Sequence, residues 1–213
     1  MKSKPRIRGL YAIADTQYLS DAGLAAAAAQ AIAGGARVLQ YRDKKGDDAR
    51  RRHQAAELLA LGRRHGVPLL INDDVALALE VGADGVHLGR EDARLSEARA
   101  QLGAAALIGV SCYNELARAL AAQTQGADYV AFGSFFPSRT KPQAVRAGLE
   151  LLRAAKRKLR IPIVAIGGIT PENGASLIAA GADALAVIEG VFGQADVRAA
   201  AERYVRLFHP PVS

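Results

Sequence analysis

Short apolar runs alternate along this chain with longer amphipathic, alanine-rich stretches. The apolar runs are almost continuous, as expected of strands that are buried on both faces. They span residues 9–14, 37–41, 68–72, 85–88, 107–111, 129–132, 163–167 and 184–188. Helical stretches lie between them, and a last one spans 197–208. Eight strands that alternate with helices predict an α/β protein folded as a single (β/α)8 TIM barrel.

A short repeat supports the closed barrel over an open sheet. A Gly-Ala pair ends a helical stretch before every second predicted strand, at Gly35, Gly82, Gly126 and Gly181. Glycine can adopt the left-handed conformation that ends a helix, so each pair predicts a turn into a strand. The chain has 213 residues and is 50% apolar, which suits one catalytic domain over 1–213 with short loops.

Composition narrows the classes of partner. The net charge of +7 comes mostly from predicted helix faces, and a positive field also attracts anionic substrates. Basic stretches are not interleaved with aromatic residues, so we expect no nucleic-acid partner. The single Cys112 cannot form an internal disulfide, and no signal-peptide or membrane-span pattern is found. We therefore expect a cytoplasmic protein without a membrane partner, and a homo-oligomer stays open.

In this fold the chemistry lies where strands end. Gln40, Arg42 and Lys44 alternate after the second strand, so they share one side while the chain stays extended. A planar guanidinium and a point charge beside a neutral donor suit a phosphate or diphosphate. The alternative is an ordinary solvated loop.

Carboxylates follow the next two strands. Asp73 and Asp92 can share one Mg²⁺, which takes one or two carboxylates together with phosphates and water. The alternative is that both aspartates are helix N-caps. His87 lies within the fourth strand, where a barrel histidine with purely structural bonds is the alternative to a ligand.

The later strand ends are rich in hydroxyls and glycines. Ser111 follows the fifth strand and lacks the base and oxyanion hole of a hydrolase triad. The sixth strand precedes an unusually long segment, 133–142, whose phosphate donors are Ser138, Thr140 and Lys141. Glycines after the last two strands, including Gly168 and Gly190, allow backbone N–H groups to approach a phosphate.

Together these residues resemble the thiamine phosphate synthase family over nearly the whole chain. The most specific stretches are QYRDK at 40–44, the Asn-Asp pair at 72–73, ADGVHLG at 83–89 with Asp92, SRTK at 138–141, and VAIGGI at 164–169. The resemblance implies that 4-amino-2-methyl-5-(diphosphooxymethyl)pyrimidine is joined to a thiazole phosphate, giving thiamine phosphate and pyrophosphate.

The resemblance also implies the role of each residue. It assigns Mg²⁺ to Asp73 and Asp92. It assigns the diphosphate to Arg42, Lys44, Asn72, Ser111 and Lys141, of which Arg42, Lys44, Ser111 and Lys141 are expected to be catalytic. It assigns the pyrimidine to Tyr11, Gln40 and His87. It assigns the thiazole phosphate to Ser138, Thr140, Gly168, Glu189 and Gly190.

Departures from the family pattern leave alternatives open. Arg90 stands where a glutamine is common, and Glu189 stands where many members have a serine beside the thiazole phosphate. The alternatives are a thiazole tautomerase on the same barrel, an isomerase or aldolase of sugar phosphates, and a non-catalytic thiamine-phosphate-binding barrel. The complete diphosphate and metal set favours the synthase.

Overall fold

A computed structural model describes residues 4–90, 94–137 and 145–209. Its strands are parallel and form a closed barrel, in which each strand pairs with the next and the last pairs with the first. The predicted (β/α)8 barrel is therefore confirmed. The strands are β1 (Gly9–Asp15), β2 (Val38–Arg42), β3 (Leu69–Asn72), β4 (Gly85–Leu88), β5 (Leu107–Tyr113), β6 (Tyr129–Phe132), β7 (Ile163–Ile166) and β8 (Ala184–Val187).

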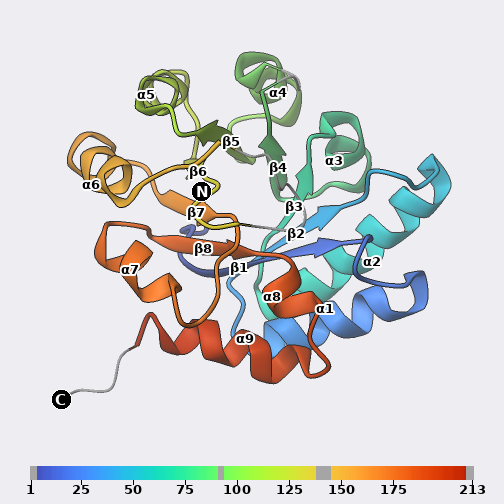
Figure 1. Ribbon diagram of the computed structural model, residues 1–213. Helices are drawn as coiled ribbons and strands as arrows, with labels where there is room; N and C mark the ends of the chain where they lie inside the picture. Colours follow the sequence, from blue (N-terminus) through green and yellow to red (C-terminus); the bar gives the residue numbers. More distant parts are fainter. Residues whose placement is uncertain (1–3, 91–93, 138–144, 210–213) are drawn as a thin grey trace.

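Helices form an outer ring around the strands, as Figure 1 shows. They are α1 (Leu24–Ala33) after a 3₁₀ turn at Asp21–Gly23, α2 (Asp48–His65), α3 (Val75–Val81), α4 (Leu95–Leu102), α5 (Leu116–Thr124), α6 (Leu149–Lys158), α7 (Gly174–Ala179), α8 (Glu189–Phe192) and α9 (Val197–Arg206). The predicted boundaries of the strands and of the last helix agree within two residues. The short α8 was not predicted. Within the described residues, no helix is long and apolar enough to cross a membrane.

The apolar residues form two layers. Because strand side chains alternate, every second one points into the barrel and the others point toward the helices. The interior layer includes Tyr11, Ile13, Val38, Leu70 and Tyr129. A larger cluster fills the space between strands and helices. The barrel interior is thus a packed core. Its residues nearest the carboxyl ends of the strands form the floor of the cavity described below.

The repeated turns have a second role at the amino ends of the strands. In three repeats an aspartate follows the Gly-Ala pair and accepts a backbone N–H near the start of the preceding strand. The bonds are Leu69 to Asp84 (2.8 Å), Ile108 to Asp128 (2.8 Å) and Ile163 to Asp183 (2.9 Å). The four glycines have positive φ, as predicted. These turns satisfy strand N–H groups that would otherwise lack partners.

Candidate active site

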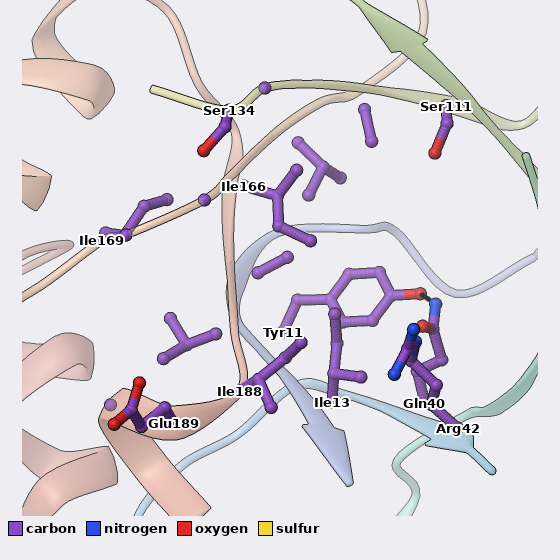
Figure 2. A pocket seen from close by; sticks show the side chains of 18 of the residues that line it. Tyr11, Ile13, Gln40, Arg42, Ser111, Ser134, Ile166, Ile169, Ile188 and Glu189 are labelled. Atoms are coloured by element: carbon purple, nitrogen blue, oxygen red, sulfur yellow. Dashed lines mark hydrogen bonds between the residues drawn. The ribbon is translucent and has the colours of Figure 1, made fainter. Parts of the chain in front are cut away.

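A cavity of about 480 Å³ opens at the carboxyl ends of the strands. Its size suits a small organic ligand. Nine of the predicted site residues line it: Tyr11, Gln40, Arg42, Asn72, His87, Ser111, Gly168, Glu189 and Gly190. Figure 2 shows Gln40 and Arg42 together on one side, with Ser134, Ile169 and Glu189 on the opposite side. The structure therefore brings most of the predicted residues together around one space.

Five polar side chains form a continuous chain of hydrogen bonds across the cavity floor. Gln40 Nε2 donates to the Tyr11 hydroxyl at 2.6 Å, and this hydroxyl lies 2.9 Å from that of Tyr129. His87 Nδ1 lies 2.9 Å from the Tyr129 hydroxyl, and His87 Nε2 lies 2.9 Å from Ser111 Oγ. Burial raises the pKa of Tyr11 and of Tyr129 above the usual value of tyrosine. Both phenols are therefore neutral hydrogen-bonding groups at physiological pH.

Tyr129 is a floor residue that sequence reasoning missed. His87, Gly109 and Tyr129 are in register on three neighbouring strands. A Cβ at Gly109 would lie 1.9 Å from the Tyr129 ring, so only glycine leaves room for it. The His87 and Tyr129 rings stack across this gap, with centroids 5.6 Å apart and an interplanar angle of 25°. A glycine inside an apolar strand was the available signal, since it marks a close approach.

Arg42 is anchored by a second residue that sequence reasoning missed. Its guanidinium forms an ion pair with Asp15, which is buried at the end of β1 and in register with Arg42. The Asp15 carboxylate also accepts the backbone N–H of Gln17 at 3.0 Å. A buried carboxylate holds the guanidinium in one orientation beside the cavity. Asp15 follows a strand, so the rule that found the other residues applied to it as well.

Lys44 and Asp73 form an ion pair beside the cavity, and neither is among its lining residues. The Asp73 carboxylate also accepts from Asn72 Nδ2 at 2.7 Å, and its backbone has a φ of 64°. The N-cap of α3 is Asp74, whose carboxylate accepts the Leu77 N–H at 2.8 Å. The N-cap alternative is therefore wrong for Asp73, whose side chain points at a cation and an amide instead.

The chemistry of this group suits a hard cation. Asp73 supplies carboxylate oxygens next to the cationic side of the cavity, and Mg²⁺ usually takes one or two carboxylates with phosphates and water. The second predicted ligand, Asp92, lies outside the described residues, as do Ser138, Thr140 and Lys141. Within residues 4–90, 94–137 and 145–209, no three His, Cys, Asp or Glu side chains gather into a metal cluster.

Asp43 organises the loop that carries Lys44. Its carboxylate accepts from Thr16 Oγ1 (2.9 Å), from the backbone of Lys45 (2.9 Å) and Gly46 (3.0 Å), and from Arg50 (2.8 Å). Burial alone would raise the pKa of Asp43, but these donors outweigh it and lower the pKa to about 2. The loop after β2 is therefore held by an ionised carboxylate that faces the protein and not the cavity.

The paired glycines after β7 let two loops touch. A Cβ at Gly167 would lie 2.1 Å from Ser134 Oγ, and a Cβ at Gly168 would lie 2.2 Å from the Pro137 carbonyl oxygen. The Phe136 N–H donates to the Gly167 carbonyl at 2.9 Å. The prediction that these glycines admit a phosphate stays a prediction, and the structure shows a packing reason for both of them. Residues 134–137, which follow β6, are thereby fixed beside the cavity.

The end of β8 is fixed by the last helix. A Cβ at Gly190 would lie 2.1 Å from the Tyr204 hydroxyl, which donates to the Ile169 carbonyl at 2.9 Å. Tyr204 on α9 thus braces the loops after both β7 and β8. Glu189 lines the cavity at the first residue of α8 and is half-buried. The departure from the family pattern therefore falls on the cavity wall.

Cys112 is excluded as a nucleophile. The side chain is fully buried, and this burial raises the pKa of its thiol to about 12. A thiol with such a pKa holds almost no thiolate at neutral pH, and only the thiolate is reactive.

A barrel with cations, an amide and hydroxyls on one side of its cavity and glycine-rich loops on the other defines a class. It is a barrel enzyme that acts on small phosphorylated molecules. Residues 10–191 match the family model described as thiamine monophosphate synthase.

Similar proteins agree with this match. A thiamine-phosphate synthase of Nitrosococcus oceani is 55% identical over 202 residues, which cover 95% of this chain and 93% of that protein. Another from Thiobacillus denitrificans is 60% identical over 178 residues, 84% of each chain. The solved structure of a thiamine phosphate pyrophosphorylase from Pyrococcus furiosus has 35% identity and a TM-score of 0.86, covering 96% of this chain and 97% of its own. The chain belongs to the thiamine monophosphate synthase family, and it is a transferase.

Proposed function

We propose that this chain, as one domain, joins the pyrimidine diphosphate to 4-methyl-5-(2-phosphooxyethyl)thiazole, with thiamine phosphate and pyrophosphate as products. The observation that supports this reaction best is the two-sided cavity, with Arg42 and a polar floor on one side and glycine-rich loops on the other. Two different phosphorylated ligands need two different sides. The dissociative course of the reaction is part of the proposal.

In the proposed course, the bond between the pyrimidine methylene carbon and the diphosphate oxygen breaks first, and the oxygen keeps the electron pair. The ring amino group donates electron density and stabilises the carbocation that remains. The thiazole nitrogen then uses its lone pair to form the new carbon–nitrogen bond. No protein nucleophile is required, which agrees with the inert Cys112. The protein must stabilise the leaving group and hold the two rings face to face.

The leaving group is assigned to the donors on the β2–β5 side. These are Arg42, Lys44, Asn72 and Ser111, and Lys141, which follows β6 in the sequence, is proposed to join them. Arg42 offers a planar fork whose orientation is set by buried Asp15. Lys44 is free to move between its partner Asp73 and an incoming phosphate, because it is an exposed side chain on a long stem. We assign Arg42, Lys44, Ser111 and Lys141 the catalytic role of neutralising charge that develops on the diphosphate.

Asp73 and Asp92 are proposed to hold Mg²⁺ together with the diphosphate. When bound, this ion would supply further positive charge at the leaving oxygens. The Asn72 amide and Lys44 hold the Asp73 carboxylate next to the cationic side of the cavity. The protein therefore presents its carboxylate where the diphosphate is expected.

The two organic rings are assigned to the floor and the wall. Tyr11, Gln40 and His87 would contact the pyrimidine, since all three lie in the floor chain. The thiazole phosphate would be bound by Ser138, Thr140, Gly168, Gly190 and the backbone of Glu189. Its pocket is proposed to lie beside the loops after β7 and β8, which both contact Tyr204.

The test of this function uses both substrates with Mg²⁺ and measures thiamine phosphate and pyrophosphate together. We expect both products in equal amounts. A tautomerase or a non-catalytic binding protein would release neither. Binding of thiamine phosphate without turnover would identify the binding protein, and that result would contradict the proposal.

Removing the carboxylate of Asp73 tests the metal assignment. In Asp73→Ala, kcat should fall on the order of a hundredfold or more, because leaving-group stabilisation is lost. The unfolding midpoint should change little, since Asp73 does not cap α3. Asp74→Ala is the matched control, because it loses the cap of α3 and should reduce stability more than activity. Undiminished turnover in the presence of EDTA would contradict the role of the metal.

A further inference from the structure

The hydrogen-bonded series Gln40–Tyr11–Tyr129–His87–Ser111 is called the floor chain below. Its bonds can all donate toward Ser111 or all donate toward Gln40, but not both at once. A tyrosine hydroxyl has one proton to donate, and a neutral imidazole has one donor nitrogen and one acceptor nitrogen. Tyr11, Tyr129 and His87 are consecutive members of the chain, so the direction chosen at one end is passed to the other. The two ends are Gln40 and Ser111, and both line the cavity.

The Gln40 end decides the direction. Gln40 Nε2 donates to the Tyr11 hydroxyl, so the Tyr11 proton must go elsewhere. Among the residues that the structure describes, the Tyr11 hydroxyl has one other hydrogen-bond partner, the Tyr129 hydroxyl, at 2.9 Å. A buried hydroxyl proton without an acceptor is costly, so Tyr11 donates to Tyr129.

The same logic extends to Ser111. Tyr129 accepts from Tyr11 and therefore donates to His87 Nδ1. His87 Nδ1 is then the acceptor nitrogen, and its Nε2–H donates to Ser111 Oγ. Because Ser111 Oγ accepts this bond, its own proton remains available for donation. Figure 2 shows the Ser111 oxygen pointing into the cavity.

This direction suits both parts of the proposed pyrimidine substrate. A diphosphate oxygen can only accept, so Ser111 must donate to it. A ring amino group donates, so Gln40 must meet it with Oε1, and Nε2 must be used elsewhere. The opposite direction would have Ser111 donate to His87 and would turn the Gln40 amide nitrogen toward the amino group. One direction of the chain therefore satisfies the two recognition events together.

We infer that Tyr129 is a positioning residue that transmits this direction between Gln40 and Ser111 and keeps His87 with its proton on Nε2. The inference rests on the proposed function for the identity of the two ligand groups. The Tyr129 hydroxyl forms hydrogen bonds with Tyr11 and His87, and Tyr129 acts on Gln40 and Ser111 through these two residues. Gly109 leaves the room that the Tyr129 ring needs.

The direction is measured first, without any activity assay. Nitrogen-15 NMR of histidine-labelled protein, at a pH above the usual pKa of histidine, distinguishes which ring nitrogen carries the proton. The chain has four histidines, and a His87→Asn variant identifies the signals of His87. We expect the Nε2–H form in the wild-type protein. A His87 proton on Nδ1 would overturn the inference whether or not the enzyme is active.

Tyr129→Phe then breaks the chain at its centre. We expect His87 to lose its preference for the Nε2–H form. We expect kcat/KM for the pyrimidine diphosphate to fall on the order of tenfold, with the KM for thiazole phosphate unchanged. The matched control is Tyr41→Phe, which also loses a buried hydroxyl. The Tyr41 hydroxyl donates to Gln54 at 2.7 Å, and neither residue belongs to the floor chain. The control should leave the His87 signals unchanged.

The outcomes separate this inference from the function on which it rests. Equal loss for both substrates in Tyr129→Phe, or no change in the His87 signals, would overturn the positioning role. If the wild-type protein made no thiamine phosphate, the proposed function would fail while the NMR result still decided the direction. If Tyr129→Phe did not fold, the wild-type proton position and the kinetics of Ser111→Ala would decide. Ser111→Ala should then lower kcat/KM for the pyrimidine diphosphate and leave the KM for thiazole phosphate unchanged.

Discussion

Aspartates lie at both ends of the barrel, and they have different roles at the two ends. At the amino ends, Asp84, Asp128 and Asp183 repeat one arrangement, in which a carboxylate accepts a strand N–H. At the carboxyl ends, Asp15, Asp43 and Asp73 have different partners at every strand. The repeated carboxylate arrangement stabilises the sheet at the amino ends, and the varied arrangement lies at the carboxyl ends, where barrels of this fold bind their ligands.

The partners of the carboxylates explain the contrast. Asp128 is bonded to Ile108 N–H, Arg99 and Lys4, so its bonding capacity is used within the protein. Arg42, Ser111 and Asn72 each have a protein partner and also line the cavity. Substitutions at the amino ends should therefore change stability, and those at the carboxyl ends should change catalysis.

Lys141→Ala should lower activity strongly without a change of stability. Loss of one donor to the leaving group costs about 3 kcal/mol, or about a hundredfold in kcat. Steady-state kinetics with each substrate varied in turn would measure it. If only the affinity for thiazole phosphate changed, Lys141 would belong to the other phosphate.

Asp128→Ala should show the reverse behaviour. It leaves the Ile108 N–H without its acceptor and removes the carboxylate partner of Arg99, at a cost of about 2 kcal/mol in the free energy of unfolding. The thermal midpoint should fall by roughly 4–8 °C, with kcat within about twofold of wild type. Asp48→Ala removes an exposed carboxylate and is the control, with an expected loss below about 1 kcal/mol. A large loss of kcat in Asp128→Ala would show that the two ends are coupled.

Asp43 should be an exception to this contrast. It lies at the carboxyl ends of the strands, yet its carboxylate has a structural role, so its substitution should change stability. Its pKa is lowered from 3.8 to about 2 in the folded protein. The stabilisation is therefore complete above pH 4 and is lost as the pH falls through about 2. Asp43→Asn should be less stable by roughly 2 kcal/mol at pH 7, and the difference should vanish near pH 2. Urea unfolding at a series of pH values would measure both curves, and parallel curves would refute the assignment.

Glu189→Ser should give the smallest effect. If the backbone at Glu189 and Gly190 binds the thiazole phosphate while the carboxylate turns aside, the KM for thiazole phosphate should change less than about tenfold, or about 1.4 kcal/mol. Glu189→Gln, which keeps the shape without the charge, is the control. A large drop in KM for both variants would show that the carboxylate faces the ligand.

The alternation of apolar and helical stretches was sufficient to predict the fold, and the strand ends were sufficient to find most of the cavity. Tyr129 was missed because its role depends on register, which brings it level with Gly109 and His87. The pairing of Lys44 with Asp73, and the cap at Asp74 instead of Asp73, depend on a turn with positive φ. Strand stagger and turn geometry are set by the closed barrel and cannot be read from local spacing.

Closure of the ring also sets the order of events when the chain is made. β1 pairs with β8 from Gly9 and Ala184 to Ala12 and Val187. A ribosome that has released β1 must therefore synthesise almost the whole chain before that strand gains its second neighbour, on the order of 10 to 40 s at usual translation rates. Until then the nascent sheet has two open edges, which can pair with other chains. These open edges make the incomplete barrel prone to aggregation until its eighth strand has been made.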